Sequence, residues 1–179
     1  MRYFLAAAIF LLQCNTDIIP RVLDDGAKIY LVRHAEKQSG NDPLLTPAGN
    51  VRAGDLLRVL KDKKIQRIYV TEYRRTQNTG DSLRIQLGID TVRYLSDTSC
   101  TDLFNKIQAH HDMDNAILII GHSNTIALMI RKFGLVDYPA DYIPDKEYDN
   151  MFLIEFKNGK AILEKMKYGA SSSASATMQ

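Results

Sequence analysis

The sequence carries little net charge and few cysteines, and it lacks the paired motifs of metal sites. Its formal net charge is +2, too small an excess to indicate a nucleic acid or a membrane surface as partner through electrostatics alone. Neither a Cys-x-x-Cys nor a His-x-x-x-His pair is present, so we expect no metal ion and no other cofactor. Only Cys14 and Cys100 could form a disulfide, and none is expected if processing or lipidation takes the first of them.

The apolar run near the N-terminus is too short to cross a bilayer as a helix, which needs about 20 residues. Residues 3–12 follow Arg2 and precede Cys14, a pattern typical of a secretory signal. The Leu-Leu-Gln-Cys ending resembles a bacterial lipoprotein signal, although Gln13 stands where a small residue is usual. We therefore expect residues 1–14 to be a signal peptide cleaved before Cys14. The protein would then be exported to the bacterial cell envelope, either to the periplasm or anchored to a membrane through lipidated Cys14. A buried first helix or strand is the alternative.

Two further segments lack the apolar periodicity of a folded element. Residues 15–27 contain Pro20 and an Asp-Asp-Gly turn signal, which predicts a tether. Residues 169–179 are rich in small polar side chains, which predicts a disordered tail. The folded part is therefore expected to be one domain, without internal repeats, over residues 28–168.

From residue 28 onward, strand-like and helix-like segments alternate. The patterns predict helices that begin at Pro47 after the capping residue Thr46, that end at Gly88 and Gly134, and that cover about 101–111. Asn158-Gly159 predicts a hairpin turn near the C-terminus. The strands are expected at residues 28–34, 67–73, 91–95 and 116–122. This order predicts a three-layer α/β/α sandwich, with a mostly parallel central sheet, helices on both faces and a C-terminal hairpin.

Polar side chains directly follow three of the predicted strands, in the sequences RHAEK, TEYRRT and GHSN. In open α/β sheets, ligands bind beyond the carboxyl ends of the strands, so two histidines and up to three arginines should meet at one edge. Arginine is a planar cationic fork that fits phosphoryl oxygens. Histidine can act as a nucleophile near neutral pH, whereas arginine cannot. The combination predicts phosphoryl transfer through a phosphohistidine.

The sequences LVRHAEK, DPLLTPAG, TEYRRTQNTG and LIIGHSNT occur in this order between about residues 28 and 135. They resemble the signatures of the histidine phosphatase superfamily, which has the phosphoglycerate mutase-like fold, and in particular its small phosphatases. The resemblance implies that His34 is the residue that becomes phosphorylated. It also implies that Arg33 and Arg75 bind the phosphate, and that His122 contacts the phosphoryl group opposite His34.

The general acid that protonates the leaving group is left open by this resemblance. Related acid phosphatases and phytases have an aspartate directly after the second histidine, where this chain has Ser123. Asp97, in the loop after the third strand, is a candidate by location, with Asp102 and Glu36 as competitors. Glu36 and Lys37 are also candidate substrate-binding residues at the rim of the pocket, or else an exposed ion pair.

These patterns predict a metal-independent phosphatase that acts on a small phosphorylated substrate, a phosphomonoester or a related phosphoryl compound. Its two steps are attack of His34 on phosphorus and hydrolysis of the phosphohistidine. Two alternatives remain open at this point. One is a phosphotransferase of the phosphoglycerate mutase kind, and the other is an inactive phosphate-binding or envelope interaction protein that keeps the fold.

Overall fold

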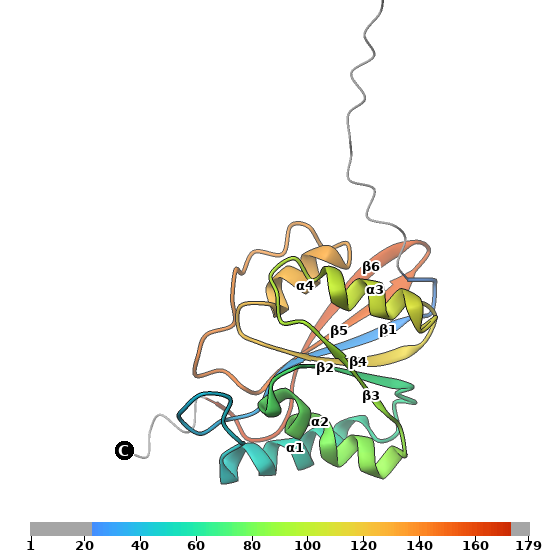
Figure 1. Cartoon of the computed structure of the whole chain (residues 1–179). Helices are drawn as coiled ribbons and strands as arrows, with labels where there is room; N and C mark the ends of the chain where they lie inside the picture. Colours follow the sequence, from blue (N-terminus) through green and yellow to red (C-terminus); the bar gives the residue numbers. More distant parts are fainter. Residues whose placement is uncertain (1–22, 173–179) are drawn as a thin grey trace, which may run out of the picture.

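Six strands form one mixed sheet in the computed structural model, which describes residues 23–172 (Figure 1). They are β1 (Lys28–Arg33), β2 (Arg67–Thr71), β3 (Thr91–Tyr94), β4 (Ala116–Gly121), β5 (Asn150–Lys157) and β6 (Lys160–Lys167). Their order across the sheet is β3-β2-β4-β1-β5-β6. The first four in this order are parallel, whereas β5 and β6 are antiparallel to their neighbours. The predicted sheet, mostly parallel with a C-terminal hairpin, is confirmed.

The central strands are apolar almost throughout because both of their faces are covered. Along β1, Ile29 and Leu31 belong to one buried hydrophobic cluster, while Tyr30 and Val32 belong to another. This division follows from the alternation of side chains between the two faces of a strand. The sheet therefore separates two cores, one on each face.

Two pairs of helices cover these faces (Figure 1). α1 (Pro47–Leu60) and α2 (Arg74–Leu87) lie on one face, and α3 (Thr101–Ala109) and α4 (Ile126–Lys132) lie on the other. The predicted ends of the first two are confirmed: the Thr46 side chain accepts a hydrogen bond from the Gly49 amide, and Gly88 closes α2 with φ of 64°. The predicted three-layer α/β/α sandwich is therefore confirmed.

The folded part of the chain extends beyond both predicted domain boundaries. Leu23 and Ala27 are buried in the core beneath α3 and α4, and Ala27 also pairs through its carbonyl with the amide of Phe156. At the other end, the carbonyl of Ala170 and the side chain of Ser172 accept hydrogen bonds from the domain. The tether prediction is thus wrong for residues 23–27, and the disordered-tail prediction is wrong for residues 169–172. The predicted signal peptide, the rest of the tether and residues 173–179 lie outside the described residues.

Within residues 23–172, no helix combines the length and the apolar character that crossing a membrane requires.

Candidate active site

The register of the central strands brings the two predicted catalytic histidines together. Arg33 at the end of β1 pairs with Gly121 at the end of β4, so the next residues of both strands emerge side by side. The amide of His34 donates to the Gly121 carbonyl at 3.0 Å, and the rings of His34 and His122 are 5.4 Å apart between centroids. The expected meeting of these strand ends at one edge of the sheet is therefore found.

His122 is held by Thr71 at the end of β2 and by Arg75 in the first turn of α2. Its Nε2 lies 3.1 Å from Oγ1 of Thr71, and its Nδ1 lies 3.5 Å from Nη2 of Arg75. Because a guanidinium can only donate, Nδ1 accepts and the proton of the neutral ring sits on Nε2, which donates to Thr71. Thr71 is fixed in turn by Thr76 in the first turn of α2, whose Oγ1 lies 2.9 Å from that of Thr71. The predicted proximity of Arg75 and His122 thus has a defined geometry.

His34 is oriented by its own backbone. Its Nδ1 lies 2.8 Å from the carbonyl oxygen of Ala35, and a carbonyl only accepts, so Nδ1 carries the proton. The neutral ring then keeps its lone pair on Nε2. The side chain is buried, with 3% of the residue exposed. This arrangement is the one that an imidazole nucleophile requires, with one nitrogen held by a hydrogen bond and the other left to attack.

Burial keeps both histidines neutral. Desolvation lowers the pKa of His34 to about 3, against the opposing hydrogen bond to Ala35, and nearby positive charge contributes in the same direction as burial. Desolvation likewise lowers the pKa of His122 to about 4, with the charges of Arg75 and Arg33 adding to the effect. At neutral pH the site therefore holds two uncharged imidazoles beside two permanent cations.

Arg33 is bound to the loop that precedes β5. Its Nη1 donates to the carbonyl oxygens of Pro144 and Asp145, at 3.1 and 2.9 Å, and its Nη2 lies 3.5 Å from the hydroxyl of Tyr148. The buried Nε of Arg33 and the buried Nε of Arg75 have no hydrogen-bond partner. An unpartnered buried donor is costly, and these two belong to cations, which favours an anion beside the two arginines.

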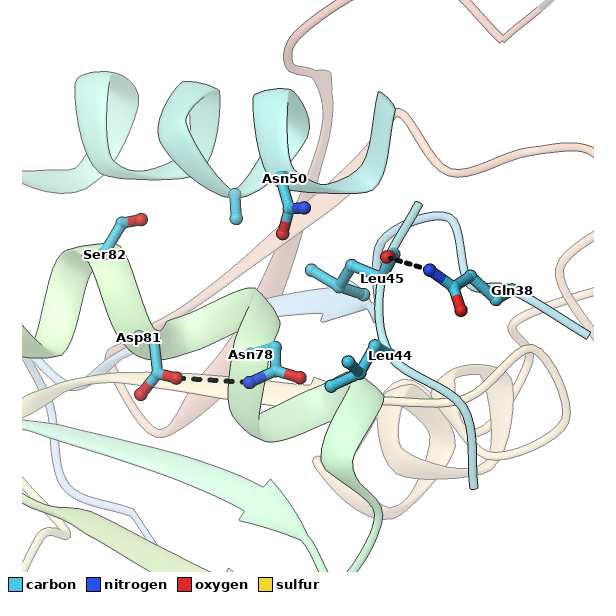
Figure 2. Close-up of a pocket in the computed structure, with 8 residues that line it drawn as sticks. Gln38, Leu44, Leu45, Asn50, Asn78, Asp81 and Ser82 are labelled. Atoms are coloured by element: carbon cyan, nitrogen blue, oxygen red, sulfur yellow. Dashed lines mark hydrogen bonds between the residues drawn. The ribbon is translucent and has the colours of Figure 1, made fainter. Parts of the chain in front are cut away.

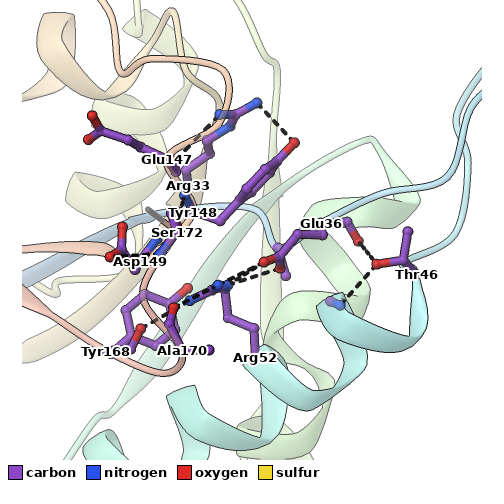
Figure 3. Close-up of polar contacts among 12 residues, drawn as sticks. Arg33, Glu36, Thr46, Arg52, Glu147, Tyr148, Asp149, Tyr168, Ala170 and Ser172 are labelled. Atoms are coloured by element: carbon purple, nitrogen blue, oxygen red, sulfur yellow. Dashed lines mark hydrogen bonds and ion pairs between the residues drawn. The ribbon is translucent and has the colours of Figure 1, made fainter. Parts of the chain in front are cut away.

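Glu36 forms an ion pair with Arg52 of α1 (Figure 3). The guanidinium of Arg52 donates to both carboxylate oxygens of Glu36 at 2.7–3.0 Å, and also to the carbonyls of Tyr168 and Ala170. Lys37 is exposed, and its backbone forms an isolated bridge to Leu45. Among residues 23–172, the structure thus pairs the Glu36 carboxylate with Arg52 and not with Lys37.

The other candidate acids make contacts near their own loop. The carboxylate of Asp97 accepts a hydrogen bond from the Ser99 hydroxyl, and that of Asp102 accepts from the Leu95 amide and pairs with Lys106. Both residues follow β3, which β2 separates from β4 in the sheet. The structure therefore shows no contact that joins either carboxylate to His34 within residues 23–172.

Three residues with contacts at or beside the site were not among the predicted site residues: Arg52, which pairs with Glu36, and Tyr73 and Tyr148, which lie near the histidines. Arg52 could have been noticed, because it shares the buried face of α1 with Ala53 and Leu56, where a charge needs a partner. The ring of Tyr73 lies 5.5 Å from that of His122, and the ring of Tyr148 lies 6.1 Å from that of His34. Neither tyrosine stands out in the sequence from the other seven.

A separate cavity of about 420 Å³ lies between α1, α2 and the loop that contains Gln38 and Leu44 (Figure 2). Asn50 from α1 and Asn78 from α2 are among the residues that line this cavity, whereas His34 and His122 are not. Among residues 23–172, no group of three or more His, Cys, Asp or Glu side chains could hold a metal ion.

Comparisons with known proteins agree with this geometry. Residues 29–99 match the family model of the histidine phosphatase superfamily (branch 1). No curated protein matches the sequence. Among solved structures, a protein from Agrobacterium tumefaciens assigned as the phosphohistidine phosphatase SixA is 17% identical, with a TM-score of 0.58 over 81% of this chain and 97% of that one. A mycobacterial glucosyl-3-phosphoglycerate phosphatase is 13% identical, with a TM-score of 0.58 over 80% of this chain and 99% of that one. The α-ribazole phosphatase of Shigella flexneri is 15% identical, with a TM-score of 0.56 over 78% of this chain and 96% of that one.

Residues 29–99, which contain the first three of the four quoted motifs, are thus similar to the histidine phosphatase superfamily (branch 1), and the described fold is similar to that of solved phosphatase structures. The family match of residues 29–99 supports an enzyme of the phosphatase or phosphomutase kind.

Proposed function

We propose that the protein is a metal-independent phosphatase that hydrolyses phosphomonoesters, or related phosphoryl compounds, through a phosphohistidine at His34. The observation that carries the proposal is the pairing of a buried, neutral His34 with two arginines whose buried Nε groups have no partner. A phosphoryl group offers negatively charged oxygens to the arginines and an electrophilic phosphorus to the histidine. A small phosphorylated molecule is therefore the proposed partner.

In the first step, Nε2 of His34 attacks phosphorus in line with the departing oxygen. The N–P bond forms as the P–O bond to the leaving group breaks, and the electron pair leaves with that oxygen. Arg33 and Arg75 donate to the peripheral oxygens, where negative charge is held in the transition state. His122 donates to the third oxygen after Arg75 turns to the phosphoryl group, with the ring proton on Nδ1 and the Thr71 hydroxyl donating to Nε2. The ring of His34 becomes cationic, and the hydrogen bond from Nδ1 to the Ala35 carbonyl stabilises that charge.

In the second step, water attacks the phosphorus of phosphohistidine and the N–P bond breaks. His34 recovers its lone pair on Nε2, and phosphate is released. The proposal assigns no role in either step to Glu36, because both of its carboxylate oxygens are bonded to Arg52. Lys37 likewise has no assigned role.

The leaving group determines how much the reaction needs a general acid. Asp97 bonds within its own loop, so its assignment as that acid has no support from the contacts around it. An aryl phosphate, an acyl phosphate or a phosphoramidate has a leaving group that departs with less help from an acid. We therefore propose that good leaving groups are the better substrates.

Export to the cell envelope remains part of the proposal. Its support is the apolar run of residues 3–12 behind Arg2, with Cys14 placed for lipidation. The intact mass of the protein recovered from a bacterial membrane fraction would show whether Cys14 is the lipidated first residue. A protein that keeps residues 1–14 in the soluble fraction would contradict both export and anchoring.

The test of the catalytic proposal is hydrolysis of p-nitrophenyl phosphate by the His34→Ala variant. We expect the variant to keep the fold, by circular dichroism, and to lose all hydrolysis because it lacks the nucleophile. His110→Ala is the matched control, since His110 is exposed after α3, and it should hydrolyse the substrate at the wild-type rate. Retained activity in His34→Ala would end the proposal.

A further inference from the structure

Tyr148 lies against the Arg33 side of the site (Figure 3). The guanidinium carbon of Arg33 is 4.2 Å from the centre of the Tyr148 ring, and that ring is 6.1 Å from the ring of His34. The main chain next to this ring is fixed by the C-terminal segment. The Oγ of Ser172 accepts hydrogen bonds from the amides of Tyr148 and Asp149, at 2.9 and 3.2 Å. The ring is therefore held beside the nucleophile while remaining partly exposed.

Tyr73 makes the corresponding contacts on the Arg75 side. The guanidinium carbon of Arg75 is 4.2 Å from the centre of the Tyr73 ring, and this ring meets the ring of His122 edge-on at 5.5 Å and 88°. Tyr73 is the N-cap residue of α2, so its position is set by the start of that helix. Like Tyr148, it is partly exposed. Two arginine–tyrosine pairs thus stand on either side of the two histidines.

We propose that Tyr73 and Tyr148 form the walls of a leaving-group subsite that takes a planar aromatic group. This inference rests on the proposed phosphatase function, because it places the phosphoryl group between the arginines and the histidines. An arginine covers one face of each tyrosine, and the other face of a partly exposed ring can stack on the group attached to the phosphate. The two tyrosines are then specificity-determining residues in addition to their contacts with the arginines.

The charges around the two arginines further restrict the kind of leaving group that the subsite would accept. The carboxylate of Asp42 lies 4.0 Å from Nη1 of Arg75 and accepts a hydrogen bond from the Arg74 amide. On the opposite side, the carboxylate of Asp145 lies 3.7 Å from Nη2 of Arg33. A leaving group with its own negative charge would meet one of these carboxylates. The subsite therefore suits a neutral or cationic aromatic group.

The competing explanation is that the tyrosines only hold the arginines in place. Benzylphosphonate and cyclohexylmethylphosphonate separate the two explanations, because both carry the same anionic head and differ in the planarity of the ring. Neither can be hydrolysed, so calorimetric titration measures binding alone. Area burial by itself would favour the more apolar cyclohexyl group, and stacking would favour the phenyl group.

We expect the wild-type protein to bind benzylphosphonate about three- to tenfold more tightly than cyclohexylmethylphosphonate. Tyr148→Leu and Tyr73→Leu should each reduce this ratio towards one, whereas Tyr148→Phe, which keeps the ring, should retain it. Methylphosphonate carries the anionic head without a ring, so its affinity measures binding to the phosphate pocket alone. If the Leu variants weaken all three ligands equally and leave the ratio unchanged, the tyrosines only hold the arginines and the inference is wrong.

A carboxyl group on the aromatic ring tests the charge argument. 4-Carboxybenzylphosphonate should bind more weakly than benzylphosphonate, and Asp42→Asn should narrow the difference; tighter binding would contradict a preference for neutral or cationic groups. Hydrolysis of p-nitrophenyl phosphate and binding of methylphosphonate test the phosphatase proposal separately from the aromatic subsite. Hydrolysis of p-nitrophenyl phosphate without any preference for the phenyl ring overturns the aromatic subsite alone. Absence of both hydrolysis and methylphosphonate binding overturns the proposed function and the subsite with it.

Discussion

The ion pair between Glu36 and Arg52 gives a prediction that separates structure from catalysis. Glu36 follows the nucleophile by two residues, and its carboxylate would be close enough in sequence to act as the general acid. The structure instead directs it to Arg52, at 2.7 Å for the shortest contact (Figure 3). Glu36→Gln should therefore reduce the stability of the fold and have little effect on the chemical step.

The expected loss in the free energy of unfolding follows from the burial of the two side chains. The side chain of Arg52 is 5% exposed and that of Glu36 is 23% exposed, so the pair is largely desolvated. Removing one partner of a buried pair costs about 3–5 kcal/mol, and the partial exposure of Glu36 places the expected loss for Glu36→Gln nearer 2 kcal/mol. Arg52→Gln should cost about 3 kcal/mol, because it also removes donors from the carbonyls of Tyr168 and Ala170.

Urea unfolding of both single variants and of the double variant gives the coupling free energy between the two side chains. We expect a coupling of about 1.5–3 kcal/mol, with kcat/KM of folded Glu36→Gln within about tenfold of the wild type. Loss of a general acid would lower the rate by about 10²–10⁴-fold instead. A coupling near zero, together with a loss of that size in kcat/KM, would refute the structural interpretation and return Glu36 to the chemistry.

The remaining predictions concern stability. Since the pKa values of His34 and His122 are lowered to about 3 and about 4, the unfolded chain takes up protons below pH 6.5 that the folded chain does not. The free energy of unfolding should fall between pH 6.5 and pH 4.5 by about 2 kcal/mol for each histidine, and that of His122→Asn should fall less than that of the wild type in urea titrations; equal slopes against pH would contradict this. Gly49→Ala should cost about 3 kcal/mol, because its Cβ would lie 2.1 Å from the Glu36 carbonyl oxygen. Gly54→Ala in the same helix meets only Arg58, at 3.8 Å, and should stabilise the fold by about 0.5–1 kcal/mol; equal effects of the two substitutions would refute the close contact.

Local patterns were sufficient to predict the layers of the fold. The helix cap at Thr46 and the terminating Gly88 depend on residues within one turn, so the sequence contains the whole signal. The meeting of His34 and His122 was also predictable, because parallel strands deliver the residues after their carboxyl ends to one edge. What the sequence could not provide was the register that sets the two rings 5.4 Å apart.

Contacts between distant segments account for what was missed. Arg52 bonds to the carbonyl of Tyr168, 116 residues away, and no spacing rule connects the two. Ser172 appears as one of several small polar residues in the sequence, yet its side chain accepts a hydrogen bond from the Tyr148 amide and fixes the main chain there. Leu23 was assigned to a tether because residues 15–27 contain turn signals and lack apolar periodicity, and only the folded core shows that it is buried.

The central claim is that His34 carries the phosphoryl group during turnover. Wild-type protein mixed with an aryl phosphate and quenched in denaturant within one turnover should carry one phosphoryl group, and peptide mapping by mass spectrometry under alkaline conditions locates it. The account predicts phosphorylation at His34 in the wild type and none in His34→Ala. Hydrolysis of the substrate with no phosphorylated histidine, or with the phosphoryl group on another residue, would contradict it.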